Sequence, residues 1–174
     1  MLKKLLPLLA TTLIVSLAVG CSAGAEPVRK VGTSPDGNEM KIESAAIKLV
    51  HAVQKSGYNL VDTEELNTWL EAGEDMFIID TMPADFYGKG HIPTALNAVM
   101  PKTGLADATD DEKAAFAALL GEDLNKKIVI YCGFTACGRS DAGATYAKEL
   151  GYTNVYRYPG GIIGWRDADF AEEK

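Results

Sequence analysis

Residues that commonly bind metals are scarce in this sequence of 174 residues, which contains only two histidines and three cysteines. Their spacing matches no zinc site, so we expect no metal and no cofactor. An excess of basic residues is also lacking, because 17 Lys and Arg stand against 24 Asp and Glu. The resulting net charge of −7 makes nucleic acid a poor partner. The hydrophobic content of 47% indicates a folded globular chain.

A hydrophobic run long enough to span a membrane is missing too. The run within residues 1–20 has about 15 apolar residues, is interrupted by Pro7, and follows two lysines. This pattern is typical of a signal peptide, and the sequence Leu-Ala-Val-Gly-Cys ending at Cys21 resembles a bacterial lipobox. We therefore expect loss of residues 1–20 and a lipid anchor on Cys21. The anchor would hold the protein at a membrane of the bacterial cell envelope, facing the periplasm. The alternative is ordinary cleavage a few residues later.

Residues 21–42 are rich in small and polar residues and contain the turn sequence Ser-Pro-Asp-Gly at 34–37. This composition predicts a flexible tether between the lipidated N-terminus and a folded domain at residues 43–174. An arm packed on that domain is the alternative.

From residue 43 onward, helical patterns alternate with short apolar runs. The runs at 76–80 and 128–131 are continuous, as in strands buried on both faces, and shorter ones follow at 95–98 and 154–158. Capping sequences at 62–65 and 109–112 open two of the predicted helices, and Gly57 is a plausible end for the first. This order predicts an α/β domain with a parallel sheet covered by helices on both faces.

The second continuous run leads directly into Cys132, and Cys137 follows within the same loop. Functional side chains gather at the carboxyl ends of parallel strands, and Cys132 occupies such a position. Asp80 and Thr81, at the end of the other run, do so too. The loop is rich in glycine and small residues, which lets its amides face a sulfur. Together with the following helix and the charge of Arg139, these amides should lower the pKa of a thiol and stabilise a thiolate or a persulfide.

Three stretches resemble the rhodanese-like sulfurtransferases: FIIDTMPADFYGKGHIPTALNA, IVIYCGFTACGRS and NVYRYPGGIIGW, in that order. The resemblance implies a single domain with a sheet of about five parallel strands. It also implies that Cys132 is the catalytic residue, with Arg139 beside it to bind an anionic donor. The sulfane sulfur would come from thiosulfate, a polysulfide or a similar donor and pass to a thiol, cyanide or sulfide. The remaining loop residues would bind the substrate: Gly133, Phe134, Thr135, Ala136, Cys137, Gly138 and Ser140. His91, in the GHIP stretch, would be structural.

The chain departs from this family in the loop that contains the cysteines. From Cys132 to Arg139 the loop is about two residues longer than is common in single-domain members, and it includes a second thiol. Cys137 has three interpretations: a resolving thiol that attacks the persulfide or closes a disulfide, a residue that holds part of a polysulfide, or a small residue lining the loop. The Asp80-Thr81-Met82 stretch also lacks an arginine that the family often has.

Other functions are compatible with the same loop. A thiol–disulfide redox protein would use Cys132 and Cys137, although their C-x4-C spacing differs from C-x-x-C. A thiol-dependent phosphatase or arsenate reductase would require a C-x5-R loop, whereas here the spacing is C-x6-R. A non-catalytic module that binds a partner is a further alternative.

Overall fold

A computed structural model describes residues 37–174 of the chain. The predicted signal peptide, Cys21 and most of the predicted tether lie outside the described residues and stay predictions. Helix α1 (Glu39–Ser56) begins inside the range predicted as tether. Within residues 37–174, no helix combines the length and hydropathy needed to cross a membrane.

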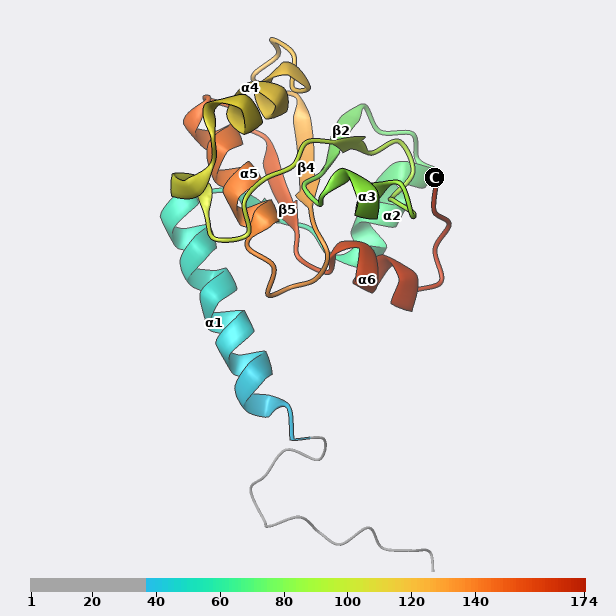
Figure 1. Ribbon diagram of the computed structural model, residues 1–174. Coiled ribbons are helices and arrows are strands. Elements are labelled where there is room, and N and C mark those ends of the chain that lie inside the picture. Colours follow the sequence, from blue (N-terminus) through green and yellow to red (C-terminus); the bar gives the residue numbers. More distant parts are fainter. Residues whose placement is uncertain (1–36) are drawn as a thin grey trace, which may run out of the picture. The chain divides into compact units, whose positions relative to one another are not determined.

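Five parallel strands form one sheet in the order β1-β5-β4-β2-β3 (Figure 1). The long strands lie in the middle: β5 (Val155–Tyr158), β4 (Lys127–Tyr131) and β2 (Met76–Asp80). Two-residue strands form the edges, β1 (Asn59–Leu60) and β3 (Leu96–Asn97). The α/β class and the five-stranded parallel sheet are thus confirmed, and β4, which precedes Cys132, occupies the centre of the sheet.

Helices cover both faces of the sheet (Figure 1). One face packs against α1, α4 (Asp110–Ala118) and α5 (Arg139–Glu149), and the other against α2 (Thr63–Glu71), α3 (Ala84–Tyr87) and α6 (Gly161–Asp167). The side chains of β4 alternate between the two cores, as expected for a strand buried on both sides. Ile128 and Ile130 enter the first core, and Val129 and Tyr131 enter the second.

The helix boundaries follow from local sequence signals. Asp62 caps α2 by accepting a hydrogen bond from the N–H of Glu65. Thr109 and Glu112 form a complete capping box at the start of α4. Gly57 ends α1 in the left-handed conformation, with φ of 69°, which glycine adopts without strain. The predicted positions of these signals are therefore confirmed. The short helix α3 and the 3₁₀ turn η1 (Leu105–Asp107) are additional elements.

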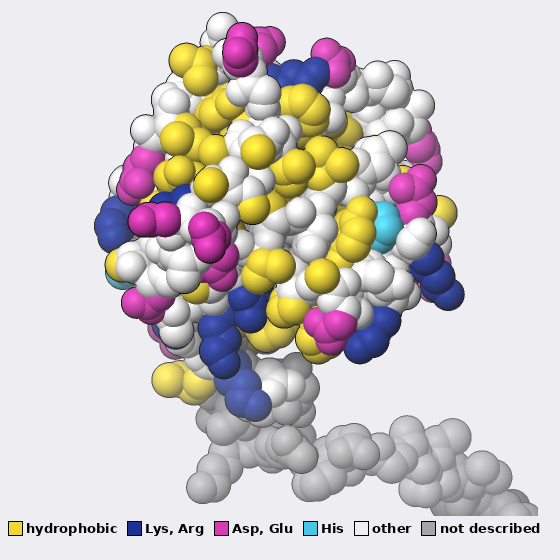
Figure 2. All heavy atoms as spheres, turned by 45° about the horizontal axis from the view of Figure 1, so that its top comes forward, with side chains coloured by type: hydrophobic (Ala, Val, Ile, Leu, Met, Phe, Trp, Pro, Cys, Tyr) yellow, Lys and Arg dark blue, Asp and Glu magenta, His cyan; other side chains and the backbone are white. Residues whose placement is uncertain are grey.

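The C-terminal segment returns to the GHIP stretch. His91 forms an antiparallel bridge with Glu173, and its ring stacks on Tyr87 with 3.8 Å between centroids. Trp165 donates its indole N–H to the carbonyl of Ala171. The surface seen in Figure 2 mixes acidic and basic side chains around hydrophobic ones, rather than presenting a field of one sign.

Candidate active site

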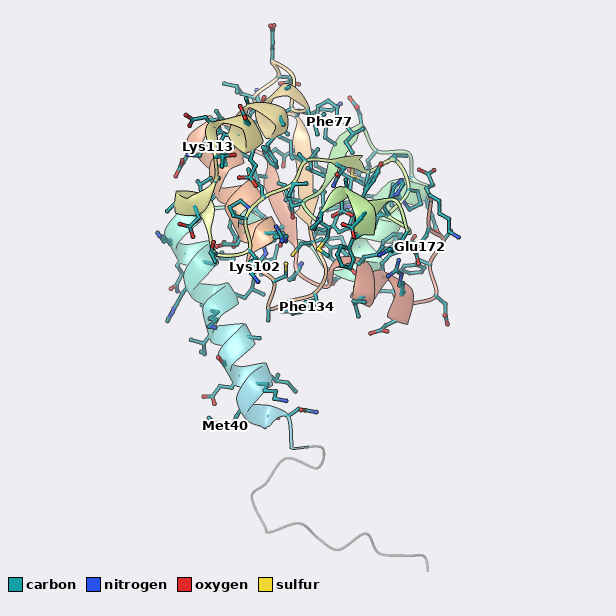
Figure 3. All side chains as sticks on the ribbon, viewed as in Figure 1. Met40, Phe77, Lys102, Lys113, Phe134 and Glu172 are labelled. Carbon is teal, nitrogen blue, oxygen red and sulfur yellow. The ribbon has the colours of Figure 1, made fainter. Side chains whose placement is uncertain are left out.

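Cys132 lies directly after β4, at the edge where the carboxyl ends of the central strands meet. Tyr131 pairs with Asp80 of β2 on one side and with Tyr158 of β5 on the other. Because β4 is enclosed by both neighbours and both helical layers, Cys132 is only 1% exposed. The loop that follows emerges at the end of the domain opposite Lys113, where Phe134 is 55% exposed (Figure 3).

The start of α6 holds the first two carbonyls of the loop. The N–H of Ile162 donates to the carbonyl of Cys132 at 2.9 Å, and the N–H of Ile163 donates to that of Gly133 at 3.1 Å. This approach requires a glycine at 161, where φ is 61° and a Cβ would lie 2.4 Å from the carbonyl oxygen of Cys132. The closing Gly-Gly turn of the sequence is therefore part of the framework of the site.

The two thiols of the loop are hydrogen-bonded to each other. Cys132 Sγ also lies 3.2 Å from Ser140 Oγ and 3.6 Å from the carbonyl oxygen of Cys137. Cys137 Sγ accepts hydrogen bonds from the backbone N–H groups of Arg139 and Gly133. The sequence predicts such amides around the sulfur of Cys132, whereas in the structure the sulfur that receives the amides of Gly133 and Arg139 is that of Cys137. We call this arrangement, with the N–H groups of Gly133 and Arg139 around one sulfur position, the amide cradle.

The surroundings of the two thiols shift their pKa values in opposite directions. Burial raises the pKa of Cys132 far above that of an ordinary thiol, and the neighbouring Cys137 adds to this. The hydrogen bond from Cys132, the two cradle amides and the charge of Arg139 lower the pKa of Cys137 to about 6. The pair therefore shares one proton at neutral pH, with the negative charge on the less buried sulfur.

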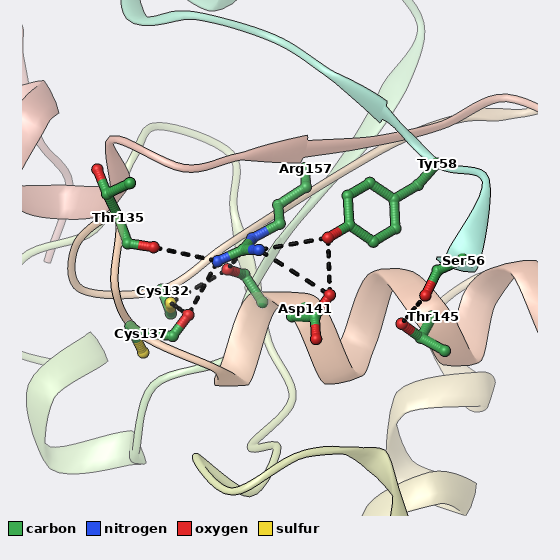
Figure 4. A network of polar contacts seen from close by, with 9 residues as sticks. Ser56, Tyr58, Cys132, Thr135, Cys137, Asp141, Thr145 and Arg157 are labelled. Carbon is green, nitrogen blue, oxygen red and sulfur yellow. Dashed lines mark hydrogen bonds and ion pairs between the residues drawn. The ribbon is translucent and has the colours of Figure 1, made fainter. Parts of the chain in front are cut away.

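Arg157, a residue that the sequence analysis did not single out, supports the loop from behind (Figure 4). Its side chain, on β5, is 4% exposed. Nε donates to Ser140 Oγ at 2.9 Å, and Nη2 donates to the carbonyls of Cys137 at 3.0 Å and Thr135 at 3.3 Å. These bonds fix the positions of the two loop carbonyls, and that of Cys137 also lies 3.6 Å from Cys132 Sγ. The available signal in the sequence was a cation within a strand that ends beside the loop of Cys132, because charges are rarely buried without a partner.

Tyr58 and Asp141 complete this support on the far side of Arg157. Tyr58 accepts from Arg157 Nη1 at 3.3 Å and donates to Asp141 Oδ1 at 2.7 Å. Asp141 Oδ1 lies 3.9 Å from Arg157 Nη1. Burial and the bond to Asp141 raise the pKa of Tyr58 to about 12, so its hydroxyl remains a donor at neutral pH. The guanidinium is thus fixed by Tyr58 directly before β1, by α5 and by the loop itself.

Arg139 contributes to the loop mainly through its backbone. Its N–H faces Cys137 Sγ, whereas its guanidinium donates to the carbonyl of Met100. The next residue along the chain, Ser140, is fully buried beside Cys132. The predicted site residues Cys132, Cys137, Arg139 and Ser140 therefore gather around the two sulfurs. Phe134, Thr135 and Ala136 form the exposed tip of the loop.

A pocket of about 280 Å³ lies between the loop and α1. Cys137 lines it and Cys132 does not. The exposed Lys48 of α1 and the buried Arg157 contribute positive charge to its wall. Asp141 lines the same pocket and supplies a negative charge, so the wall on the side of Cys137 carries charges of both signs.

The sequence also predicts functional side chains at the end of β2, where Asp80 is 1% exposed. Its Oδ1 accepts the N–H of Met82 at 2.8 Å, and burial raises its pKa. Thr81 donates its hydroxyl to the carbonyl of Tyr131 at 2.7 Å. Within residues 37–174, no three His, Cys, Asp or Glu side chains gather closely enough to hold a metal ion.

Known proteins share this architecture. Residues 62–168 match the rhodanese-like domain family. The tRNA uridine(34) hydroxylase of Erwinia tasmaniensis is 32% identical over 110 residues, which are 59% of this chain and 29% of that protein. The chain therefore spans less than a third of the length of this relative.

Solved structures resemble the fold. A crystal structure of a protein from Bacillus halodurans matches with a TM-score of 0.53 and 25% identity, over 74% of this chain and 85% of that one. The homodimeric polysulfide-sulfur transferase of Wolinella succinogenes matches with a TM-score of 0.55 and 15% identity, over 78% of this chain and 92% of that one. At that identity the second likeness concerns the fold alone.

Proposed function

The chain belongs to the rhodanese-like domain family, and on this premise we propose that it is a sulfurtransferase whose Cys132 carries sulfane sulfur as a persulfide. One observation supports this most directly. Cys132 lies at the base of the loop after the central strand, with the hydroxyl and N–H of Ser140 and the amide cradle beside its sulfur. Such donors stabilise a thiolate and the anionic outer sulfur of a persulfide.

The proposed reaction has two halves. The Cys132 thiolate attacks the outer sulfur of thiosulfate or a polysulfide, the S–S bond of the donor breaks, and sulfite or a shorter polysulfide leaves. An acceptor such as a thiol, cyanide or sulfide then attacks the outer sulfur of the Cys132 persulfide, and Cys132 leaves as a thiolate. This is covalent catalysis, in which one difficult transfer is divided into two easier ones.

Each half-reaction needs a proton or a charge in a defined place. Before loading, the proton on Cys132 can pass to Cys137 along the hydrogen bond that joins the two sulfurs. Lys48 and the Arg139 guanidinium attract the anionic donor to this end of the domain. Arg157 binds the carbonyls of Thr135 and Cys137, and its positive charge offsets their dipoles beside the developing negative charge.

The test is loading of sulfur under reducing conditions. The purified full-length chain is mixed with thiosulfate or polysulfide, and the intact mass and the modified peptide are determined. We expect a mass gain of one sulfur atom on Cys132, and a fall in cyanide-dependent turnover of about 10³-fold in Cys132→Ser. Sulfur that never appears on Cys132 from either donor would rule out the proposal.

A second function has specific support, because the two thiols are already hydrogen-bonded. A thiol–disulfide redox protein would form a Cys132–Cys137 disulfide that exchanges with other thiols, without any sulfur loading. A phosphatase or arsenate reductase receives less support, since the Arg139 guanidinium binds the carbonyl of Met100. Hydrolysis of an aryl phosphate in the same samples would favour that alternative.

A further inference from the structure

The amide cradle holds a second sulfur of the protein itself. Cys137 Sγ accepts the N–H groups of Gly133 and Arg139 and contacts Cys132 Sγ. In the proposed persulfide, the outer sulfur is likewise anionic, and it is covalently bonded to Cys132 Sγ. In the reduced protein the Cys137 sulfur therefore occupies the position in which these amides would stabilise the outer sulfur of the Cys132 persulfide.

The amides of the cradle face one sulfur position, so the outer sulfur and the Cys137 sulfur compete for them. Cys132 is 1% exposed, and its sulfur is enclosed by the side chain of Ser140 and by the carbonyl and thiol of Cys137. Cys137 is half-buried, and the preceding residues 134–136 are exposed. When sulfur is loaded on Cys132, Cys137 can therefore leave the cradle towards the 280 Å³ pocket that it lines.

The displaced Cys137 is a nucleophile held close to the persulfide. Within the cradle, Cys132, the amides and the charge of Arg139 lower its pKa to about 6, so the thiol becomes mainly ionised at neutral pH as it returns there, whereas an ordinary cysteine is mainly protonated. Its return to the cradle turns the outer sulfur out of it and brings the thiolate back to the atom that it contacts in the reduced protein, which is Cys132 Sγ, the inner sulfur of the persulfide. The short loop between the two cysteines keeps the effective concentration of this thiolate high.

We propose that Cys137 is a second catalytic thiol that discharges the Cys132 persulfide reductively and releases sulfide. The inference rests on the proposed persulfide function and extends it. The Cys137 thiolate attacks Cys132 Sγ, a Cys132–Cys137 disulfide forms, and the bond between Cys132 Sγ and the outer sulfur breaks. The outer sulfur keeps the electron pair, takes up a proton from water and leaves as HS⁻. The two thiols are oxidised, and the sulfane sulfur is reduced to sulfide.

An external dithiol completes the cycle. One of its thiolates attacks the disulfide, and its second thiol displaces the mixed disulfide, so Cys132 and Cys137 return to thiols while the dithiol becomes a disulfide. The net reaction converts sulfane sulfur and a dithiol into sulfide and a disulfide. A dithiol is thus the class of co-substrate that this site requires, and a separate sulfur acceptor is not needed.

The experiment is a single turnover without acceptor. The full-length chain is loaded anaerobically with polysulfide, desalted, and followed over time by sulfide release and by peptide mass under non-reducing conditions. We expect the wild type to release one sulfide per loaded chain and to form the Cys132–Cys137 disulfide. Cys137→Ser and Cys137→Ala should load Cys132 and then release sulfide at least about tenfold more slowly. Cys21→Ser, which removes the only other cysteine, should behave like the wild type.

The outcomes separate this inference from the proposed function. If both Cys137 variants load sulfur on Cys132 and release sulfide as fast as the wild type, the inference is wrong and the persulfide function stands. Transfer of the sulfur onto Cys137, without a disulfide, would also overturn it, since Cys137 would then attack the outer sulfur. Failure of the wild type to load Cys132 would instead reject the persulfide function itself.

Discussion

The loops after β2 and β4 begin side by side, because Asp80 pairs with Tyr131 in the sheet. Each starts near a buried ionisable group, Asp80 in one and Cys132 in the other. After β2 the backbone N–H of Met82 has a hydrogen-bond acceptor within the turn, which is the carboxylate of Asp80. After β4 the carbonyls are bound by α6 and Arg157, and the amides are left for the sulfurs.

The difference between the two loops shows that a position at a strand end does not by itself make an active site. What distinguishes the β4 loop is the direction in which its peptide groups point, and that direction is imposed by residues outside the loop. Substitutions of those supporting residues should therefore affect the β4 loop strongly, whereas changes in the β2 loop should leave the chemistry intact.

The largest effect is expected for Arg157→Met. It removes the donor to two loop carbonyls, Ser140 and Tyr58, and leaves each of them with one hydrogen-bond partner fewer and Asp141 without its cation, which should lower the free energy of unfolding by about 3 kcal/mol. Urea unfolding measures this loss. Arg139→Met is the matched control. Among residues 37–174 its guanidinium donates only to the carbonyl of Met100, so the substitution should cost about 1 kcal/mol. The reverse order would contradict the supporting role of Arg157.

An intermediate effect is expected for Gly138→Ala, where the loop joins α5. A Cβ at 138 would lie 2.3 Å from the carbonyl oxygen of Lys102, so the backbone must move, at a cost of about 1–3 kcal/mol. Sulfur loading should slow because the N–H of Arg139 moves with it. Gly133→Ala is the control at the other end of the loop, since its Cβ would meet only the side chain of Met82, at 3.5 Å. Equal losses in the two variants, by urea unfolding and loading rate, would refute this explanation.

The smallest effect is expected for Asp80→Asn in the β2 loop. Asparagine keeps an oxygen acceptor for the N–H of Met82, and sulfur loading should stay within about twofold of the wild type. Burial raises the folded-state pKa of Asp80 above its ordinary value of 3.8. Its contribution to stability is therefore complete below that value and is lost as the pH rises through the folded pKa.

The variant has no such loss at higher pH. The free energy of unfolding of Asp80→Asn, relative to the wild type, should therefore increase from about pH 4 upward. Urea unfolding of both proteins across this range measures the difference. A difference that does not vary with pH would mean that Asp80 titrates as an ordinary carboxyl.

Sequence patterns predicted much of the fold because most elements carry strong local signals. Continuous apolar runs identified β2 and β4, and the capping residues Asp62 and Thr109 marked two helix starts. Strand β1 contains two residues and α3 four, too few for any periodicity to be visible. Their formation depends on contacts made by the assembled sheet.

The site was predicted in part for the same reason. Cys132, Cys137 and Ser140 are close in sequence, so their proximity could be inferred from the loop alone. The role of Arg157 depends on the pairing of Ile130 with Arg157 between β4 and β5, which only the folded sheet establishes. Which sulfur receives the amides was equally hidden, because it depends on the path of the loop past Lys102 and α6.

The dependence of the loop on α6 and Arg157 has a consequence for the order of events during synthesis. A ribosome makes the chain from its N-terminus, so both cysteines leave it before the residues that bind their loop. Until β5 and α6 dock, the carbonyls of Cys132 and Gly133 lack the partners that turn the amides inward. Docking of the C-terminal segment is therefore the step that converts an open pair of thiols into an enclosed one.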